Sequence, residues 1–336
     1  MRREIDEIPE AVQRLLDHSR AETDAAGAAL RDRDPAFLVT IARGSSDHAA
    51  HFIKYATELT AGIPVASLGP SLASIYGARL KLQTGAALAV SQSGQSPDIV
   101  AMLEGCRRGG AVGVALVNTA GSPLALAAHH AIDIAAGPEI AVAATKSFVN
   151  SIVAGLALLA SWTRDEALAQ ALAMLPRHLE DALALDWTSL VDEFAGAPSL
   201  YMLGRGPSLA IASEAALKLK ETANLHAEAY SSAEVLHGPV ALVDRAFPVI
   251  AFAARDAAED SVSAMADGLI EKGARVFVSS AKSNRASRLS LVETGHPLTD
   301  SLCLIVPFYG LAEANSRALG YNPDRPEKLS KVTETR

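Results

Sequence analysis

Three charged side chains of one segment have the spacing that proton-transfer chemistry needs. Glu214, Lys218 and Glu221 stand at i, i+4 and i+7 of an expected helix, so they project from one helix face. A carboxylate beside an ammonium can act as a base whose pKa is tuned by its neighbour. The same spacing is typical of a solvent-exposed ladder of ion pairs, and the local pattern by itself favours that interpretation.

A second group of acid and base side chains follows within HAEAYSSAEVLHGP: His226, Glu228, Glu234 and His237. A histidine there could move protons near neutral pH, although a polar surface loop has the same composition. The segment lacks the HExxH spacing of a zinc site. His48 and His51 form an i, i+3 pair with no third ligand in view, so no metal site is predicted.

A third candidate site is a loop rich in serine and glycine. An apolar run at 86–90 leads into SQSGQS at 91–96, and a helix is expected from Pro97 with Ser96 as its N-cap. A helix start of this kind offers free backbone N–H groups and a positive dipole, so it could hold a phosphate without Lys or Arg. Gly94 would let the backbone approach the ligand. An ordinary strand-to-helix turn remains the alternative.

These residues need strands and helices to position them, and the hydrophobic pattern supplies both. Short apolar runs alternate with helical patterns in the first half, at 37–43, 64–68, 86–91, 111–117 and 131–135. Similar runs recur in the second half, at 200–204, 247–254, 274–280 and 301–308. Strands that alternate with helices predict a mostly parallel sheet covered on both faces. Ser46 and Ser91 would then lie at the same sheet edge, where such folds bind ligands.

The domain organisation is expected to be a repeat of one α/β unit. IARGSS at 41–46 and LGRGPS at 203–208 each end an apolar strand with Arg-Gly-x-Ser, so Arg43 and Arg205 would occupy equivalent places in two similar units. We predict five parts: a helical arm at 1–34, a first domain at 35–165, a helical linker at 166–195, a second domain at 196–320 and a tail at 321–336.

Composition excludes several classes of function. The 336 residues carry 30 basic and 38 acidic side chains, a net charge of −8, and only 5% are aromatic, so nucleic acid is not an expected partner. The longest apolar stretch, at 148–162, is shorter than the roughly 20 residues that a membrane span needs, so a buried helix is expected there. The N-terminus does not resemble a signal peptide, and Cys106 and Cys303 are too few for a disulfide framework. A cytoplasmic protein is the expectation.

Four ordered blocks together resemble the sugar isomerase (SIS) family: SQSG at 91–94, EIAVAATKSF at 139–148, EAALKLKETANLHAEAYSSAEVLHGP at 214–239 and RPEKLSKVT at 325–333. The sequence is most similar to the isomerase half of glucosamine-6-phosphate synthases and to the glucosamine-6-phosphate deaminases built in the same way. The resemblance implies an α/β fold of two tandem SIS domains. Each would be a mostly parallel sheet flanked by helices in a flavodoxin-like, three-layer αβα arrangement.

The resemblance also implies roles for individual residues. The phosphate of a sugar phosphate would bind to five side chains: Ser46, Ser91, Gln92, Ser93 and Ser96. Val142 and Ser330 would lie near the sugar, and Glu221 would shuttle a proton between C1 and C2. His237 would assist ring opening from the neighbouring subunit of a homodimer. Lys331, which looks locally like a solvated lysine, would take part in ring opening and imine chemistry, and Lys218 would line the same site.

The implied activity is that of a glucosamine-6-phosphate deaminase, without metal or other cofactor. Where a synthase has a glutaminase domain with a cysteine nucleophile, this chain starts with a helical arm, so ammonia release is the expected direction. Arg43 stands where synthases tend to have cysteine, and Ala144 where they tend to have serine. Three alternatives stay open: a deglycase for phosphorylated fructosamine conjugates, a plain aldose-ketose phosphate isomerase, and a non-enzymatic sensor of sugar phosphates.

Overall fold

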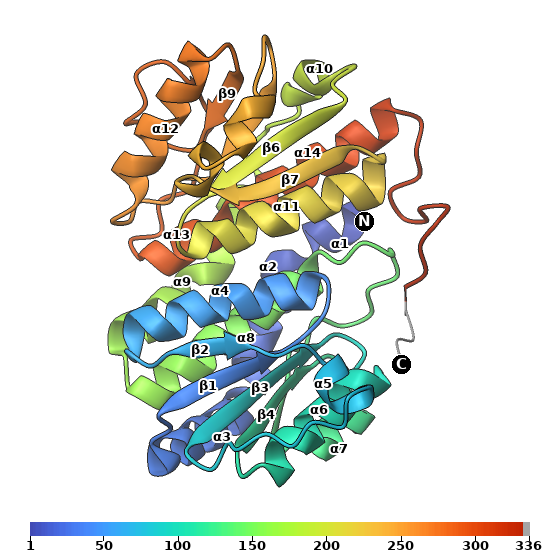
Figure 1. Ribbon diagram of the computed structural model, residues 1–336, viewed down its shortest axis with the longest axis vertical. Helices are drawn as coiled ribbons and strands as arrows, with labels where there is room; N and C mark the ends of the chain where they lie inside the picture. The colour runs from blue at the N-terminus through green and yellow to red at the C-terminus, as the bar shows by residue number, and fades with distance from the viewer. Residues whose placement is uncertain (332–336) are drawn as a thin grey trace. The chain divides into compact units, whose positions relative to one another are not determined.

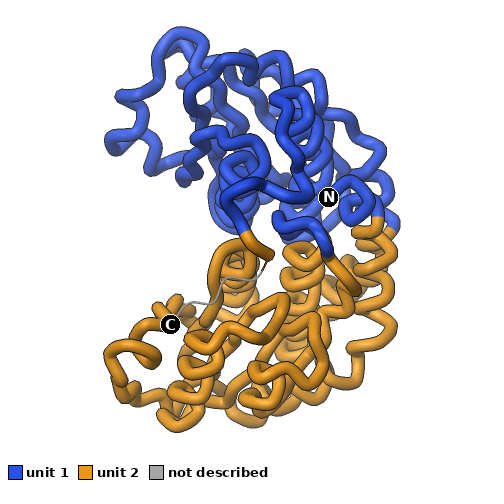
Figure 2. The backbone as a smooth tube through the Cα atoms, turned by 90° about the vertical axis from the view of Figure 1, so that its right-hand side faces the viewer, with its two compact units in different colours: residues 1–6, 140–145, 177–329 blue, residues 7–139, 146–176, 330–336 orange. Residues whose placement is uncertain are grey.

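The computed structural model describes residues 1–331, which form two compact units (Figure 2). Unit 1 contains residues 1–6, 140–145 and 177–329. Unit 2 contains residues 7–139, 146–176 and 330–331 of the described chain. Each unit is therefore assembled from segments that are distant in the sequence.

Unit 2 is built on a five-stranded parallel sheet (Figure 1). Its strands are β1 (Phe37–Ile41), β2 (Val65–Ser67), β3 (Gly85–Ser91), β4 (Val112–Val117) and β5 (His130–Asp133), in the order β2-β1-β3-β4-β5. All seven residues of β3 are buried, as expected of a central strand covered on both faces. The five apolar runs of the first half are thus confirmed as strands of one parallel sheet.

Helices cover both faces of this sheet. They are α2 (Ile8–His18), α3 (Arg20–Arg33), α4 (Ser45–Thr60), α5 (Ser71–Ser74), α6 (Pro97–Arg108), α7 (Pro123–Ala127), α8 (Lys146–Thr163) and α9 (Glu166–Leu183), the last of which continues into unit 1. Helices α5, α6 and α7 cover one face, and α3, α4 and α8 cover the other. The expected buried helix at 148–162 is confirmed as α8. Its polar Asn150 is buried because its amide donates to the carbonyls of Ala11 and Ile134, at 2.9 and 2.7 Å.

Unit 1 has its own five-stranded parallel sheet. The strands are β6 (Ser199–Gly204), β7 (His226–Ser231), β8 (Pro248–Ala251), β9 (Arg275–Val278) and β10 (Ser287–Arg288), in the order β10-β9-β8-β6-β7. Its helices are α1 (Arg2–Asp6), α10 (Leu190–Phe194), α11 (Pro207–Ala223), the 3-10 turns η1 (Glu234–Leu236) and η2 (Pro239–Leu242), α12 (Glu259–Glu271), α13 (Pro297–Cys303) and α14 (Ile305–Ala318). The chain therefore has an α/β fold with two parallel sheets flanked by helices.

The two sheets contain repeats of one strand-to-helix unit. The start of β6 and the start of α11 are separated by the same length of chain as the start of β1 and the start of α4. Gly44 and Gly206 occupy the same left-handed conformation before these helices, with φ/ψ of 56/−134° and 61/−136°. The short sequence echo around Arg43 and Arg205 therefore marks a structural repeat.

Two segments differ from the sequence-based expectation. The strand predicted at 301–308 is wrong, because these residues form the end of α13 and the start of α14. A short apolar run fits a strand or a buried helix equally well, and here His296 caps a helix by accepting from the Leu298 N–H at 3.3 Å. The loop interpretation of 226–231 is also wrong, because the segment forms β7. An edge strand keeps part of its surface exposed and so tolerates the polar residues of this segment. Within residues 1–331, no helix is long and apolar enough to span a membrane.

Candidate active site

The carboxyl ends of β1 and β3 form the edge of the unit 2 sheet where the sequence predicts a phosphate site. β1 pairs with β2 on one side and with β3 on the other, so the strand order reverses between β1 and β3. Open α/β sheets bind ligands beyond the strand ends at such a point. Ser46 follows β1 in the first turn of α4, and the segment 91–96 follows β3. The fold brings these two predicted segments to neighbouring strand ends.

The loop at 91–96 is shaped by its own serine side chains. The Ser91 hydroxyl accepts from the Gly94 N–H at 3.2 Å, and the Ser93 hydroxyl accepts from the Gln95 N–H at 3.3 Å. Gly94 has a φ of +63°, a left-handed conformation that favours glycine. Ser96 is the N-cap of α6, as predicted, but its hydroxyl makes no capping hydrogen bond. Gln92, the remaining predicted phosphate ligand, is half-buried at the start of this loop.

The start of α6 offers fewer backbone donors than the sequence suggests. Pro97 has no N–H, and the Ile99 N–H donates to the Asp98 side chain at 2.9 Å. The other carboxylate oxygen of Asp98 accepts from Arg43, whose Nε and Nη2 lie at 3.0 and 2.8 Å. Sequence reasoning assigned no role to Asp98, because the pairing of an N-terminal helix residue with a residue 55 positions away has no local signal.

The corresponding edge of unit 1 lacks the serine-rich loop. The loop after β8 contains no serine, and α12 begins with Glu259 and Asp260, whose charges oppose an anion at this helix start. Arg255 of this loop bonds to Glu293 and to Asp300, at 2.6 and 3.1 Å. The two repeats therefore share a topology, and the features that favour phosphate binding belong to unit 2.

The charged face of α11 in unit 1 is buried rather than solvated. Lys218 and Glu214 are fully buried, and their ion pair measures 3.3 Å. Glu221 also bonds to the Lys218 ammonium, while 21% of its side chain stays exposed. The Tyr309 hydroxyl donates to Glu214 at 3.4 Å. The local interpretation as a solvent-exposed ladder is therefore wrong, since only the Glu221 end of the cluster reaches the surface of unit 1.

Charge balance keeps Lys218 protonated. Burial is the largest influence and lowers the pKa of Lys218, but Glu214 and Glu221 together outweigh it, so that this pKa lies above its usual value. The Lys218 ammonium thus lies against two carboxylates, one fully buried and one partly exposed. A carboxylate in this setting can accept a proton from a carbon acid while the ammonium remains charged beside it.

His237 lies in an exposed part of unit 1. It follows η1, and its N–H donates to the Glu234 carbonyl at 2.9 Å. Leu236 and Leu242 nearby are also exposed, by 51% and 64% of their surface. His226 and Glu228 belong to β7, and the Tyr230 hydroxyl donates to Glu228 at 2.7 Å, which raises the pKa of Tyr230 to about 12.

The C-terminal tail makes specific contacts within each unit. In unit 1 the Val142 N–H donates to the Asp324 carbonyl at 3.1 Å. In unit 2 the Lys331 ammonium donates to Glu139 at 3.1 Å, so the interpretation of Lys331 as a solvated lysine is wrong. Ser330, beside it, is exposed. The predicted tail extends to 336, and its last five residues, 332–336, lie outside the described residues.

Glu139 is a buried residue for which the sequence predicts no role, although it belongs to the block at 139–148. One carboxylate oxygen accepts from the Ser147 hydroxyl at 2.6 Å, and the other accepts from the Ser147 N–H at 3.1 Å. These bonds fix the carboxylate that holds Lys331. Both partners belong to the block at 139–148: Glu139 precedes α8, and Ser147 lies in its first turn. Their closeness in sequence is the local feature from which this contact could have been predicted.

The cysteines do not contribute a nucleophile. Cys106 and Cys303 are both buried and unbridged. Burial raises the pKa of Cys106 to about 11 and raises that of Cys303 as well, so both stay protonated near neutral pH. In the described part of the chain, His, Cys, Asp and Glu side chains nowhere form a group of three that could hold a metal ion.

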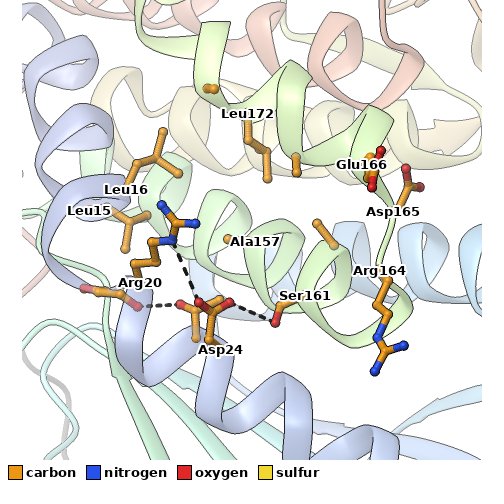
Figure 3. A pocket seen from close by; sticks show the side chains of 15 residues that line it. Leu15, Leu16, Arg20, Asp24, Ala157, Ser161, Arg164, Asp165, Glu166 and Leu172 are labelled. Carbon is orange, nitrogen blue, oxygen red and sulfur yellow. Dashed lines mark hydrogen bonds and ion pairs between the residues drawn. The ribbon is translucent and has the colours of Figure 1, made fainter.

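A separate groove of about 570 Å³ lies among α2, α3, α8 and α9 of unit 2 (Figure 3). Leucines and alanines, among them Leu15 and Leu172, line much of it. Asp24 accepts from the Ser161 hydroxyl at 3.1 Å and pairs with Arg20 at 3.8 Å. None of the predicted site residues lines this groove, so it is distinct from the strand ends that carry the serine loop.

Comparison with known proteins places this architecture in a family. The SIS domain model matches residues 33–161 and 193–292. A glutamine–fructose-6-phosphate aminotransferase (isomerizing) of Symbiobacterium thermophilum is 35% identical over 313 residues, which cover 88% of this chain and 51% of that protein. The chain spans about half the length of the curated relatives that it matches.

Two solved structures are similar over nearly the whole chain. One, from Silicibacter pomeroyi DSS-3 and provisionally named a phosphosugar isomerase, is 57% identical with a TM-score of 0.94, covering 96% of this chain and 99% of that one. The other is the C-terminal domain of a glucosamine-fructose-6-phosphate aminotransferase from Francisella tularensis. It is 26% identical with a TM-score of 0.87, covering 96% of this chain and 97% of that one. With two parallel α/β sheets and both halves matched by the family model, the chain belongs to the SIS domain family.

Proposed function

We propose that the protein is an enzyme acting on sugar phosphates, a deaminase that converts glucosamine 6-phosphate and water to fructose 6-phosphate and ammonia. The observation that carries the proposal is the state of Glu221. Its carboxylate is partly exposed and is held by a fully buried Lys218 ammonium, the arrangement that a positioned general base requires. The serine loop at 91–96 supports a phosphorylated substrate.

The chemistry assigned to these residues balances without a cofactor. The ring opens to an aldehyde at C1, and Glu221 removes the proton from C2, the carbon that carries the amino group. O1 gains a proton as the enolamine forms, and the enolamine nitrogen then loses one as the C2 proton is returned to C1, which leaves a hydroxyl group at C1 and an imine at C2. Water then adds to the imine carbon and ammonia leaves, which gives the C2 ketone of fructose 6-phosphate. The phosphate bound in unit 2 would supply remote binding energy that orients C1 and C2.

Opening of the sugar ring needs an acid and a base, and His237 and Lys331 are proposed to serve as these two groups. A histidine can exchange protons near neutral pH, and exposed His237 is accessible to a second subunit of a homodimer. Lys331 is held by Glu139, so its ammonium is kept ordered beside the start of α8. Val142 and Ser330 are proposed to contact the sugar through their backbone.

Neither cysteine of this chain is placed to hydrolyse glutamine. Such a reaction needs an accessible thiolate, whereas Cys106 and Cys303 are buried and protonated. The reaction proposed for this site therefore uses ammonia itself as the nitrogen species, and release is the direction favoured at low ammonia concentration.

The direct test is to follow ammonia and fructose 6-phosphate together after purified protein is added to glucosamine 6-phosphate. We expect both products in equal amounts. N-acetylglucosamine 6-phosphate is the control, because its amide nitrogen cannot form the same imine. Interconversion of sugar phosphates without ammonia would select the isomerase. Activity only on fructosamine 6-phosphate conjugates would select the deglycase, and binding without turnover would select the sensor.

A further inference from the structure

Arg43 is the cation that the chain itself places directly after a strand of the unit 2 sheet, at the edge that carries the serine loop. Five segments follow the strands of this sheet: 42–46, 68–71, 92–96, 118–122 and 134–139. Arg43 is the single Lys or Arg among them. Arg14 and Lys331 contact the segment 134–139, after β5 at the edge of the sheet, through Ala135, Ala136 and Glu139. A phosphate dianion bound at the ends of β1 and β3 would meet neutral donors, helix dipoles and the guanidinium of Arg43.

The N-terminus of α6 attracts an anion less strongly than an ordinary helix N-terminus does. A nearby cation would therefore contribute more to phosphate binding. Pro97 contributes no N–H, and the Ile99 N–H is engaged by Asp98. The Asp98 carboxylate also places a negative charge in the first turn, where it opposes a bound phosphate. A positive charge near this turn is needed to offset it.

Arg43 lies where that charge is needed. Its Nε and Nη2 donate to one oxygen of Asp98, at 3.0 and 2.8 Å, and the Asp98 side chain is fully buried. Half of the Arg43 side chain is exposed. A guanidinium has five N–H donors, and Asp98 accepts two of them. The guanidinium is therefore held beside the first turn of α6, and Asp98 leaves some of its N–H donors unused.

We propose that Arg43 is a phosphate-binding residue that supplies the positive charge of the site, and that Asp98 is the positioning residue that holds it there. The inference rests on the proposed function, because both assign the serine loop to the phosphate of the substrate. It adds a specificity element: the protein should prefer the phosphate dianion to the monoanion and to unphosphorylated sugars, since a fixed charge rewards the more highly charged ligand.

The chain offers a matched control for the test. Arg205 occupies the equivalent position of the second repeat and precedes α11 as Arg43 precedes α4. Helix α11 places Glu221 roughly 21 Å along its axis from Pro207, at about 1.5 Å per residue, so Arg205 is remote from the proposed base. Arg205→Gln changes the net charge by the same amount as Arg43→Gln and leaves every residue of unit 2 unchanged.

The experiment measures the dissociation constants of inorganic phosphate and of glucosamine 6-phosphate by calorimetry at fixed ionic strength. We expect Arg43→Gln to weaken both by about 10- to 100-fold, the loss expected for a charge-assisted hydrogen bond. Arg43→Lys should bind more tightly than Arg43→Gln because it keeps the charge. Arg205→Gln should bind as the unmodified chain does.

A double variant separates phosphate binding from mere neutralisation of Asp98. Arg43→Gln leaves a buried carboxylate without its cation and could destabilise unit 2, whereas Arg43→Gln with Asp98→Asn replaces the ion pair by a neutral pair of similar shape. If the double variant still binds phosphate at least about tenfold more weakly than the unmodified chain, Arg43 contacts the phosphate. Affinity restored to within about twofold would overturn the proposal. Failure of the proposed function gives a different result: inorganic phosphate binds in an Arg43-dependent manner, but no ammonia is released.

Discussion

At the scale of single residues, the cluster of Glu214, Lys218 and Glu221 is the part of the protein whose chemistry is most constrained. A buried ammonium is unfavourable unless carboxylates surround it, and two of them do so here. Glu214 is fully buried with Lys218 and Tyr309 as partners, so its role is to hold the ammonium. Glu221 is the partly exposed member of the cluster, and the proposal therefore places the substrate there.

Glu221→Gln should abolish turnover while it leaves sugar-phosphate binding nearly unchanged. The amide keeps the size of the side chain but cannot accept the C2 proton, so kcat should fall by about 10³-fold or more. Stopped-flow or endpoint ammonia assays measure kcat, and calorimetry measures the dissociation constant.

Glu271→Gln on α12 is the control, because its carboxylate is exposed in a surface ion pair with Arg285. It should retain the activity of the unmodified chain. Turnover of Glu221→Gln at the normal rate would rule out Glu221 as the base.

At the scale of elements, the serine loop depends on the left-handed conformation of Gly94 and on the close approach of its α-carbon to Ser122. A Cβ built at Gly94 would lie 2.2 Å from the Ser122 hydroxyl and 2.7 Å from the Ser122 Cβ. Ser122 is the N-cap of α7 and accepts from the Ala125 N–H. The loop after β3 is therefore held against the start of α7.

Gly94→Ala should weaken phosphate binding by tenfold or more, on the order of 1–2 kcal/mol, because either the loop or α7 must move. Gly121→Ala is the control. Gly121 has a similar φ of +70°, but a Cβ there would meet no atom within 4 Å. It should lower the thermal midpoint slightly and leave phosphate affinity unchanged. Equal phosphate affinities for the two variants would show that the close packing of Gly94 against Ser122 does not matter for phosphate binding.

A second prediction at this scale concerns Asp267, which organises the segment before β10. The pKa of Asp267 is lowered from its usual value to about 2. The main cause is the hydrogen bond that the carboxylate accepts from the Ser283 hydroxyl, and the next is the bond from the Asn284 backbone N–H. A carboxyl group whose pKa is lowered in the folded state stabilises the fold at pH values above its unfolded pKa. That stabilisation is lost as the pH falls through the folded-state pKa of about 2. Asp267→Asn should therefore reduce the urea midpoint at pH 5, and the difference from the unmodified chain should shrink toward pH 2.

Asp260→Asn serves as the comparison for Asp267→Asn, because Asp260 is largely exposed and pairs with Lys282 at the surface. It should change the urea midpoint little at either pH. A deficit of Asp267→Asn that stayed constant from pH 5 to pH 2 would show that the carboxylate charge is not what stabilises the segment.

At the scale of the whole molecule, we expect a homodimer whose active sites use His237 of the neighbouring subunit. His237 is exposed beside the exposed Leu236 and Leu242, as a residue that serves another subunit would be. Glu221→Gln and His237→Ala should each be inactive alone.

Mixed and reassociated, these two variants should recover about a quarter of normal activity, because half of the dimers are hybrids with one intact site each. Light scattering checks the expected dimer independently of the activity. No recovery in mixtures shown to contain hybrid dimers would place both residues in one subunit's site.

Much of the fold could be predicted from the sequence because the strands are short, apolar and regularly spaced. Residues 38–42 and 86–91 of these runs are buried in the middle of a parallel sheet, where most side chains must be apolar on both faces. The run at 301–308 has a similar apolar composition, yet it is helical. It was predicted wrongly because composition does not distinguish a buried helix from a buried strand. β7 was missed for the opposite reason, since an edge strand does not require an apolar sequence.

By itself, the sequence determined the α/β class, the internal repeat around Arg43 and Arg205, and the residue types that acid–base chemistry and phosphate binding need. These follow from periodicity and spacing along the chain. Tertiary structure decided which charges are buried and which are paired: Lys218 and Glu214 are buried rather than a solvated ladder, Lys331 pairs with buried Glu139, and Arg43 pairs with buried Asp98. Burial depends on what packs over a side chain from distant segments, and the local sequence does not contain that information.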